Sequence, residues 1–164
     1  MNKKYCEHNG KRIAYVDEGN GDPIIFFHGN PTSSYLYRNI ISDLKGEYRC
    51  FAADMIGMGD SDKLDNSSHM TYTFQTHYEY LCSFIDSLNF DKKVTLVGQD
   101  WGGPLSIKWA REHPDRVRGI CYFETVIAPA KFPANEEICS DLVKYSIMDD
   151  ITTVSYTHLT LPTK

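Results

Sequence analysis

Apolar and polar positions alternate near the start of the chain and then give way to runs that are apolar on both faces. Lys11–Val16 alternates in the manner of a half-buried strand. The preceding segment Lys4–Glu7 is separated from it by Asn9 and Gly10, a pairing that favours a tight turn and predicts an antiparallel hairpin. Pro23–Phe27 is apolar throughout, as expected of a strand buried in the middle of a sheet.

Later segments alternate between strand and helix patterns. A helix is predicted after Ser33 and Ser34, whose hydroxyls are good N-caps, and another at Gly102–Arg111. Thr73–Leu88 has apolar residues three and four positions apart, which predicts an amphipathic helix with one face formed by Phe74, Tyr78, Leu81, Phe84, Ile85 and Leu88. Further strands are predicted at Arg49–Met55, Val94–Val97 and, as another buried strand, Val117–Phe123. This order favours an α/β fold: a mostly parallel sheet with helices on both faces and ligands at the carboxyl ends of the strands.

Composition and charge exclude several classes of partner. The 164 residues carry a net charge of -5 and no patch of Lys and Arg, which argues against nucleic acid or an anionic membrane as partner. The N-terminus lacks the apolar core of a signal peptide, and no run approaches transmembrane length, so we expect a cytoplasmic protein. The five cysteines show no CxxC spacing, and we expect buried free thiols without a disulfide framework or a metal site.

The candidate chemistry centres on Asp100, which lies between the strand at Val94–Val97 and the helix at Gly102–Arg111. The surrounding sequence, GQDWGG, places small residues on both sides of a sharp strand-to-helix turn, where esterases carry a serine nucleophile. A carboxylate at this position can displace a leaving group from a saturated carbon and become an ester itself. The alternative is that Asp100 is a plain N-cap, although a cap does not require the flanking glycines.

Four motifs together resemble the haloalkane dehalogenases, which are α/β hydrolases that cleave carbon–halogen bonds. They are HGNPTSSYLYR with Asn30, the loop DMIGMGDSDK, the elbow GQDWGG, and YFETVIAP with Glu124. Their order and spacing match the branch of the family that uses glutamate as the catalytic acid. The resemblance runs from about Lys11 to Asp149, and it implies a haloalkane as the small-molecule substrate and no cofactor or metal.

The resemblance also implies a role for each matched residue. Asp100 would be the nucleophile that forms an aspartyl-alkyl ester, and Glu124 would be the acid that orients a catalytic histidine. Asn30 and Trp101 would bind the departing halide through their side-chain N–H groups. Their backbone N–H groups would hold the nucleophile and later the oxyanion. Taken singly, Asn30 could instead form an Asx turn, Trp101 could pack in the core, and Glu124 could be a solvated strand end.

The catalytic base is missing from the expected position. In the family, the histidine follows the acid, and the only histidine after Glu124 is His158. We therefore predict that this chain contains no catalytic base, and that His28 in the HGNP turn is structural. Two other functions stay open: an epoxide hydrolase, which also has an aspartate at this elbow, and a coelenterazine luciferase, a monooxygenase with similar motifs. Asn30 argues against the first, while Pro31 and Gly103 favour the dehalogenase modestly over the second.

The chain is short for an α/β hydrolase with an inserted cap. We predict that residues 1–127 form the N-terminal part of the core domain, and that residues 128–153 begin an incomplete helical cap domain. Residues 154–164 read as a translated sequencing adaptor, with a natural unstructured tail as the alternative. Such a fragment is expected to be aggregation-prone and inactive in turnover, although Asp100 could be alkylated once. Oligomeric state and substrate size do not follow from the sequence.

Overall fold

The computed structural model describes residues 1–65, 68, 71–88 and 90–125. Its elements in chain order are β1 (Lys3–His8), β2 (Lys11–Glu18), β3 (Asp22–Phe27), the 3-10 helix η1 (Ser34–Tyr37), α1 (Arg38–Leu44), β4 (Tyr48–Ala53), α2 (Phe74–Ser87), β5 (Val94–Gln99), α3 (Gly102–Glu112), the 3-10 helix η2 (Pro114–Arg116) and β6 (Val117–Phe123). The predicted cap, residues 128–153, and the predicted tail, residues 154–164, lie outside the described residues.

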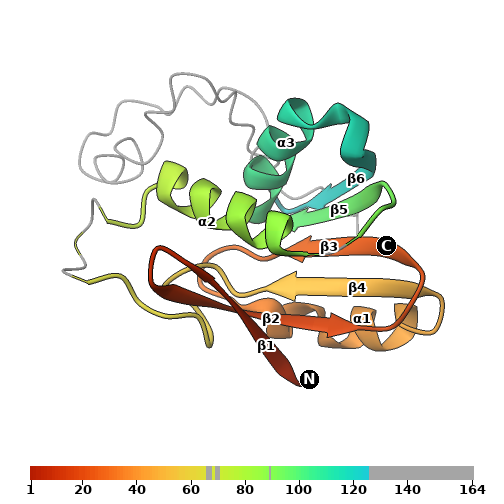
Figure 1. Ribbon diagram of the computed structural model, residues 1–164, viewed down its shortest axis with the longest axis horizontal. Coiled ribbons are helices and arrows are strands. Elements are labelled where there is room, and N and C mark those ends of the chain that lie inside the picture. Colours follow the sequence, from red (N-terminus) through yellow and green to blue (C-terminus); the bar gives the residue numbers. More distant parts are fainter. Residues whose placement is uncertain (66–67, 69–70, 89, 126–164) are drawn as a thin grey trace, which may run out of the picture.

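One sheet organises the described part of the chain (Figure 1). Its strand order is β1-β2-β4-β3-β5-β6. The predicted hairpin of β1 and β2 is confirmed as an antiparallel pair, and β2 also runs antiparallel to β4. The pairs β3–β4, β3–β5 and β5–β6 are parallel, so the carboxyl ends of four strands meet at one edge. This edge is where the sequence places its four motifs.

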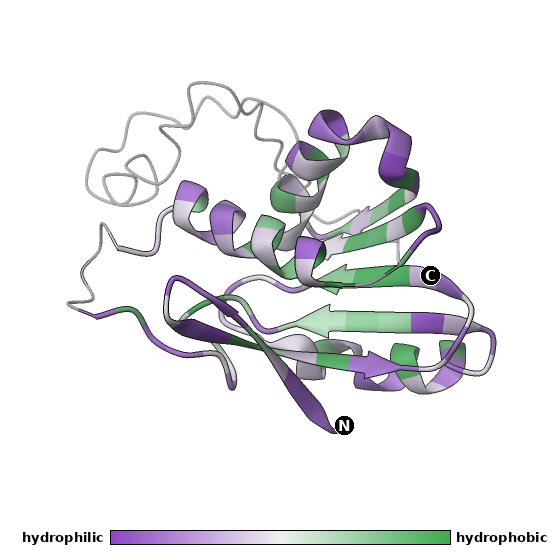
Figure 2. Cartoon of the chain, viewed as in Figure 1, coloured by the Kyte–Doolittle hydropathy of each residue, from purple (hydrophilic) through white to green (hydrophobic). Residues whose placement is uncertain are grey.

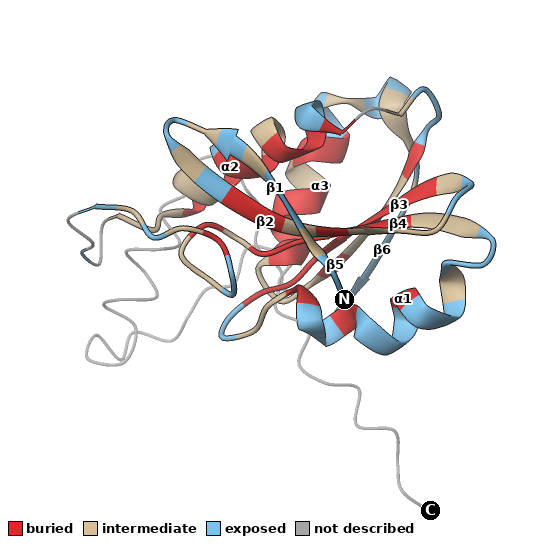
Figure 3. Ribbon diagram, turned by 60° about the horizontal axis from the view of Figure 1, so that its bottom comes forward, coloured by how far each residue is buried: buried red, intermediate tan, exposed pale blue. Residues whose placement is uncertain are grey.

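Helices cover both faces of the sheet, as predicted. Figure 3 shows α1 on one side and α2 and α3 on the other. Alternate residues of β3 serve the two faces: Ile24 and Phe26 pack with α1, whereas Ile25 and Phe27 pack with α2 and α3. The apolar colouring of β3, β4 and β5 in Figure 2 reflects this burial on both faces. The predicted apolar face of α2 is confirmed, because Phe74, Tyr78, Leu81, Phe84, Ile85 and Leu88 are all buried.

Two strand predictions require correction. The predicted strand Arg49–Met55 ends at Ala53 in the structure, because the next residues turn towards loop contacts: Asp54 accepts hydrogen bonds from two loop N–H groups, and the Met55 N–H donates to His28. The strand Val117–Phe123 has the predicted bounds, but most of its residues are exposed and none is buried. It is the last strand in the described sheet order, paired only with β5 there, so pattern alone could not reveal its edge position.

The structure also corrects the prediction for the cysteines. Within the described part of the chain the thiols are free, as predicted, but only Cys50 is buried. Cys6 and Cys82 are half-buried, and Cys121 is exposed on β6. An apolar sequence neighbourhood therefore did not by itself bury a side chain at a sheet edge. In addition, no helix among the described residues is long and apolar enough to span a membrane.

Candidate active site

Asp100 lies at the turn between β5 and α3, with its backbone in the left-handed region at a φ of 50°. Aspartate tolerates this conformation better than most residues, but the conformation must be held by the surroundings. The Asp100 N–H donates to the carbonyl of Glu124 at 3.1 Å. Its own carbonyl accepts from the Gly103 N–H at 3.1 Å and from the Thr125 hydroxyl at 2.5 Å. The neighbouring strand end thus fixes the turn and projects the carboxylate from the sheet edge.

Glycines at the elbow are required by close approach. A Cβ on Gly98 would lie 2.5 Å from the Ser106 hydroxyl oxygen and 2.6 Å from the Gly102 carbonyl oxygen. A Cβ on Gly102 would lie 2.0 Å from the carbonyl oxygen of Phe27, where no Cβ can be placed. The helix therefore packs directly against the ends of β5 and β3, which explains the small residues on both sides of the turn.

The carboxylate does not cap the helix. Helix α3 begins at Gly102 with Trp101 at the N-cap position, and no side chain makes a capping hydrogen bond there. Instead, Asp100 Oδ1 accepts a hydrogen bond from the backbone N–H of Asn30 at 2.9 Å. This bond crosses between two parallel strands, because Asn30 follows β3 and Asp100 follows β5. The predicted contact between the backbone N–H of Asn30 and the carboxylate of Asp100 is therefore present.

The side chain of Asn30 is exposed and does not form the alternative Asx turn. The N–H of Thr32, which such a turn would use, donates to the carbonyl of Gly29 at 2.9 Å. Asn30 and Trp101 both line a cavity of about 320 Å³. The walls of this cavity are mostly apolar and are completed by Met55, Ile56, Gly57, Met58, Tyr72, Phe74, His77 and Leu105. The two predicted halide donors thus share one apolar cavity beside the Asp100 turn, and most of the other lining residues were not predicted.

Trp101 both packs against the core and lines the cavity, two arrangements that the sequence left as alternatives. Its ring lies 6.4 Å from that of Phe74 and packs against the main core cluster. It nevertheless reaches the cavity and is only half-buried. Glu124 directly follows β6, is exposed, and has a φ of 48°. Its carbonyl holds the Asp100 N–H, so the predicted acid lies next to the predicted nucleophile along the sheet edge.

His77 is a cavity residue that the sequence reasoning missed. It lies on α2 between the core positions Phe74 and Tyr78, and it stacks on Tyr72 at 6.0 Å. Its Nδ1 atom is buried without a hydrogen-bond partner among the described residues. Burial lowers the pKa of His77 to about 4. Its helical spacing from Phe74 and Leu81 is the signal that could have placed it on the inner face.

We expect this pKa to make folding stability depend on pH. The unfolded chain takes up a proton near the ordinary value of 6.5, whereas folded His77 resists protonation until about 4. Stability is therefore full above about 6.5 and falls between 6.5 and 4. At pH 5.5, protonation of His77 in the unfolded chain lowers the free energy of unfolding by about 1.4 kcal/mol. Urea unfolding at pH 7.5 and pH 5.5 measures this, and the loss should shrink by about that amount in His77→Gln; an unchanged loss contradicts the prediction.

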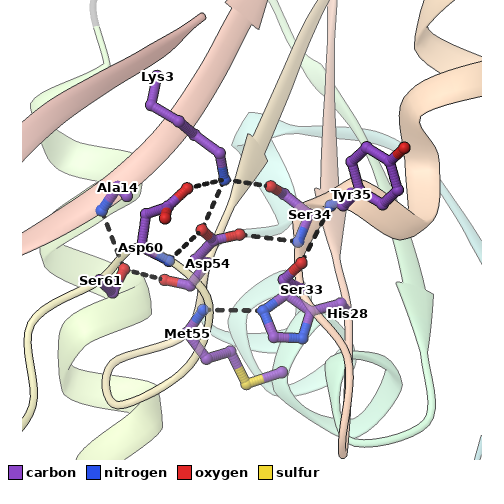
Figure 4. A network of polar contacts seen from close by, with 10 residues as sticks. All are labelled: Lys3, Ala14, His28, Ser33, Ser34, Tyr35, Asp54, Met55, Asp60 and Ser61. Atoms are coloured by element: carbon purple, nitrogen blue, oxygen red, sulfur yellow. Dashed lines mark hydrogen bonds and ion pairs between the residues drawn. The ribbon is translucent and has the colours of Figure 1, made fainter. Parts of the chain in front are cut away.

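A polar cluster centres on Asp54, the residue before the cavity residue Met55 (Figure 4). The carboxylate accepts from Lys3 Nζ at 2.5 Å, from the Ser34 N–H at 2.8 Å and from the Asp60 N–H at 2.9 Å. Burial alone would raise the pKa of Asp54, but the hydrogen bonds from Lys3, Ser34 and Asp60 outweigh it and lower the pKa. The cluster joins β1 to the loops after β3 and β4, which carry Asn30 and part of the cavity wall. No group of His, Cys, Asp and Glu suited to a metal ion occurs in the part of the chain described here.

Comparison with known proteins agrees with this geometry. A sequence model of the alpha/beta hydrolase fold matches residues 22–138. The chain belongs to the α/β-hydrolase-fold family. It is 51% identical over 137 residues to a haloalkane dehalogenase from Sphingobium indicum, which covers 82% of this chain and 46% of the relative. It is 50% identical over 129 residues to a haloalkane dehalogenase from Mycolicibacterium smegmatis, covering 79% of this chain and 42% of that relative.

The solved structures give the same result within this family. The crystal structure of the haloalkane dehalogenase DatA from Agrobacterium tumefaciens C58 superposes with a TM-score of 0.69 at 41% identity, covering 75% of this chain and 40% of that one. The resemblance to haloalkane dehalogenases that the motifs indicated is therefore confirmed. This α/β-hydrolase-fold chain spans about half the length of the curated relatives it matches.

Proposed function

We propose that this chain carries the nucleophile and the halide-binding residues of a haloalkane dehalogenase. Asp100 attacks the carbon that bears the halogen, the carbon–halogen bond breaks, and the electron pair leaves with the halide. The product is an alkyl ester on Asp100. The single observation that carries the proposal is the Asp100 carboxylate, held at a positive-φ turn by the Asn30 N–H, beside an apolar cavity that Asn30 and Trp101 line.

The cavity suits this substrate class for two reasons. Its apolar walls match an alkyl chain, whose removal from water is favourable by roughly 25 cal/mol per Å². The indole N–H of Trp101 and the carboxamide of Asn30 are neutral donors, and neutral donors stabilise a departing halide without a competing counter-ion. The similarity to haloalkane dehalogenases favours dehalogenation over an epoxide hydrolase or a luciferase.

The second step, hydrolysis of the ester, requires a base that activates water. We propose that Glu124 orients such a base, in keeping with its position beside Asp100. The sequence predicts no base histidine at the family position within this chain, and His158 lies outside the described residues. We therefore expect the 164-residue chain to form the ester on Asp100 without hydrolysing it. The cytoplasmic location stays a prediction.

A single-turnover experiment tests the proposal. The chain is incubated with 1-bromobutane, and intact mass and bromide release are followed together. We expect one butyl group per folded chain, located on the peptide that contains Asp100, and one equivalent of bromide. Trp101→Phe should keep the fold but lower the alkylation rate by about 10²-fold, because one donor to the leaving halide is lost. Unchanged mass in a folded sample, or label elsewhere than Asp100, would contradict the proposed function.

A further inference from the structure

The peptide unit between Gly29 and Asn30 is held from both sides. Its carbonyl oxygen accepts from the Thr32 N–H at 2.9 Å, from the Thr32 hydroxyl at 2.8 Å, and makes a 3.0 Å contact with Nδ1 of His28. In a planar trans peptide the C=O and the next N–H point in opposite directions. Donors on the Gly29 oxygen therefore direct the Asn30 N–H the other way, towards Asp100 Oδ1 at 2.9 Å.

The hydrogen bonds of His28 determine which ring nitrogen carries the proton. Nε2 lies 2.9 Å from the backbone nitrogen of Met55, which is a donor, so Nε2 must be the unprotonated acceptor (Figure 4). The proton then lies on Nδ1, which donates to the carbonyl of Gly29. The side chain is completely buried, and burial lowers its pKa, which keeps the ring neutral.

The partner of Nε2 is itself fixed. Met55 directly follows Asp54, whose carboxylate is held by Lys3 and by the Ser34 and Asp60 N–H groups. Figure 4 shows these contacts converging from β1 and from the loops after β3 and β4. The imidazole of His28 therefore connects a rigid point, the Met55 N–H, to the peptide unit that contacts the nucleophile. The backbone at Gly29 also lies close to Asp100, since a Cβ on Gly29 would lie 2.2 Å from Asp100 Oδ1.

We propose that His28 is a positioning residue: its Nδ1–H holds the Gly29 carbonyl so that the Asn30 N–H faces Asp100, and this sets the alkylation rate. The rate part of this inference rests on the proposed function, whereas the hydrogen bond does not. The structural role predicted for His28 is thereby assigned to one atom, Nδ1.

Two variants separate the two nitrogens of His28. The amide of His28→Asn lies near the position of Nδ1 and can still donate to Gly29, but it cannot reach the Met55 N–H. The amide of His28→Gln extends to the position of Nε2 and can accept from Met55, but it leaves the Gly29 carbonyl without this donor. Each variant loses one hydrogen bond and some packing, so each is expected to lose stability by a similar amount.

The proposal predicts opposite behaviour at the site. With the rate expressed per folded chain, alkylation by 1-bromobutane should fall by about tenfold or more in His28→Gln and stay within about threefold of wild type in His28→Asn. The amide proton of Asn30 in ¹H–¹⁵N spectra should move upfield in His28→Gln and stay near its wild-type position in His28→Asn. A merely structural role predicts that both variants behave alike, and that result would overturn the proposal.

Two further outcomes keep the inference falsifiable. If wild type is not alkylated, the proposed function fails, while the Asn30 amide shifts still decide whether His28 positions the peptide. If either variant does not fold, the ¹⁵N shifts of the His28 ring in the wild-type chain decide. A neutral ring with the proton on Nδ1 supports the inference, and a proton on Nε2 overturns it, because Nδ1 could then not donate to Gly29.

Discussion

Asp100→Asn should abolish the transfer of a butyl group from 1-bromobutane to the chain, with a rate loss of at least about 10⁴-fold. The amide oxygen is uncharged and a poor nucleophile, although it has the same shape as the carboxylate oxygen. Asparagine tolerates the positive φ of this turn, and its Oδ1 can still accept from the Asn30 N–H. The variant should therefore fold like wild type and fail only in chemistry, as measured by intact mass over time.

A matched control is Asp115→Asn, which makes the same change at an exposed position in η2. It should be alkylated at the wild-type rate. If Asp100→Asn retained labelling at that rate while Asp115→Asn lost it, or if both retained it, Asp100 would not be the nucleophile. Circular dichroism and urea unfolding of both variants establish that a loss of labelling is not a loss of fold.

Lys3→Met should produce the largest stability effect among the charged residues of the site. Lys3 Nζ bonds the fully buried Asp54 at 2.5 Å and the Ser34 hydroxyl at 2.6 Å. Removing one partner of a buried ion pair leaves an uncompensated charge, which costs about 3 kcal/mol. Methionine keeps the apolar stem, so the loss reports the missing ammonium. Urea unfolding at pH 7 measures the change in the free energy of unfolding.

The neighbouring Lys4→Met provides the control on the same strand. The Lys4 side chain is 56% exposed against 17% for Lys3, and its partner Asp17 keeps Arg49 at 2.9 Å. This variant should lose no more than about 1 kcal/mol. The difference in the free energy of unfolding between Lys3→Met and wild type should also narrow as the pH falls. The pKa of Asp54 is lowered in the folded chain. The stability that its ionised carboxylate contributes is therefore present above the ordinary value of 3.8 and is lost as the pH falls below it. Equal losses in the two variants would contradict the role assigned to Lys3.

The main differences between expectation and structure concern the edge strand β6 and the end of strand β4. The pattern of Val117–Phe123 is that of a buried strand, and the structure confirms its bounds, but strand order leaves Cys121 and its neighbours exposed. An apolar pattern shows that a strand can be covered on both faces, but it does not show whether the described chain covers it. The strand at Arg49–Met55 ended early for a related reason, because Asp54 and Met55 use their polar groups in loop contacts that only the fold brings within reach.

The sequence by itself determined the order of strands and helices, the apolar face of α2, the glycine-flanked turn at Asp100 and the family resemblance. These follow from local periods and from motif spacing, which are properties of neighbouring residues. Only the tertiary structure decided that the Asp100 carboxylate accepts from Asn30 rather than capping α3, that His77 lines the cavity, and that His28 contacts both Gly29 and Met55. The physical reason is that these contacts join residues from different strands. A hydrogen bond across parallel strands depends on strand order and register, which no local pattern contains.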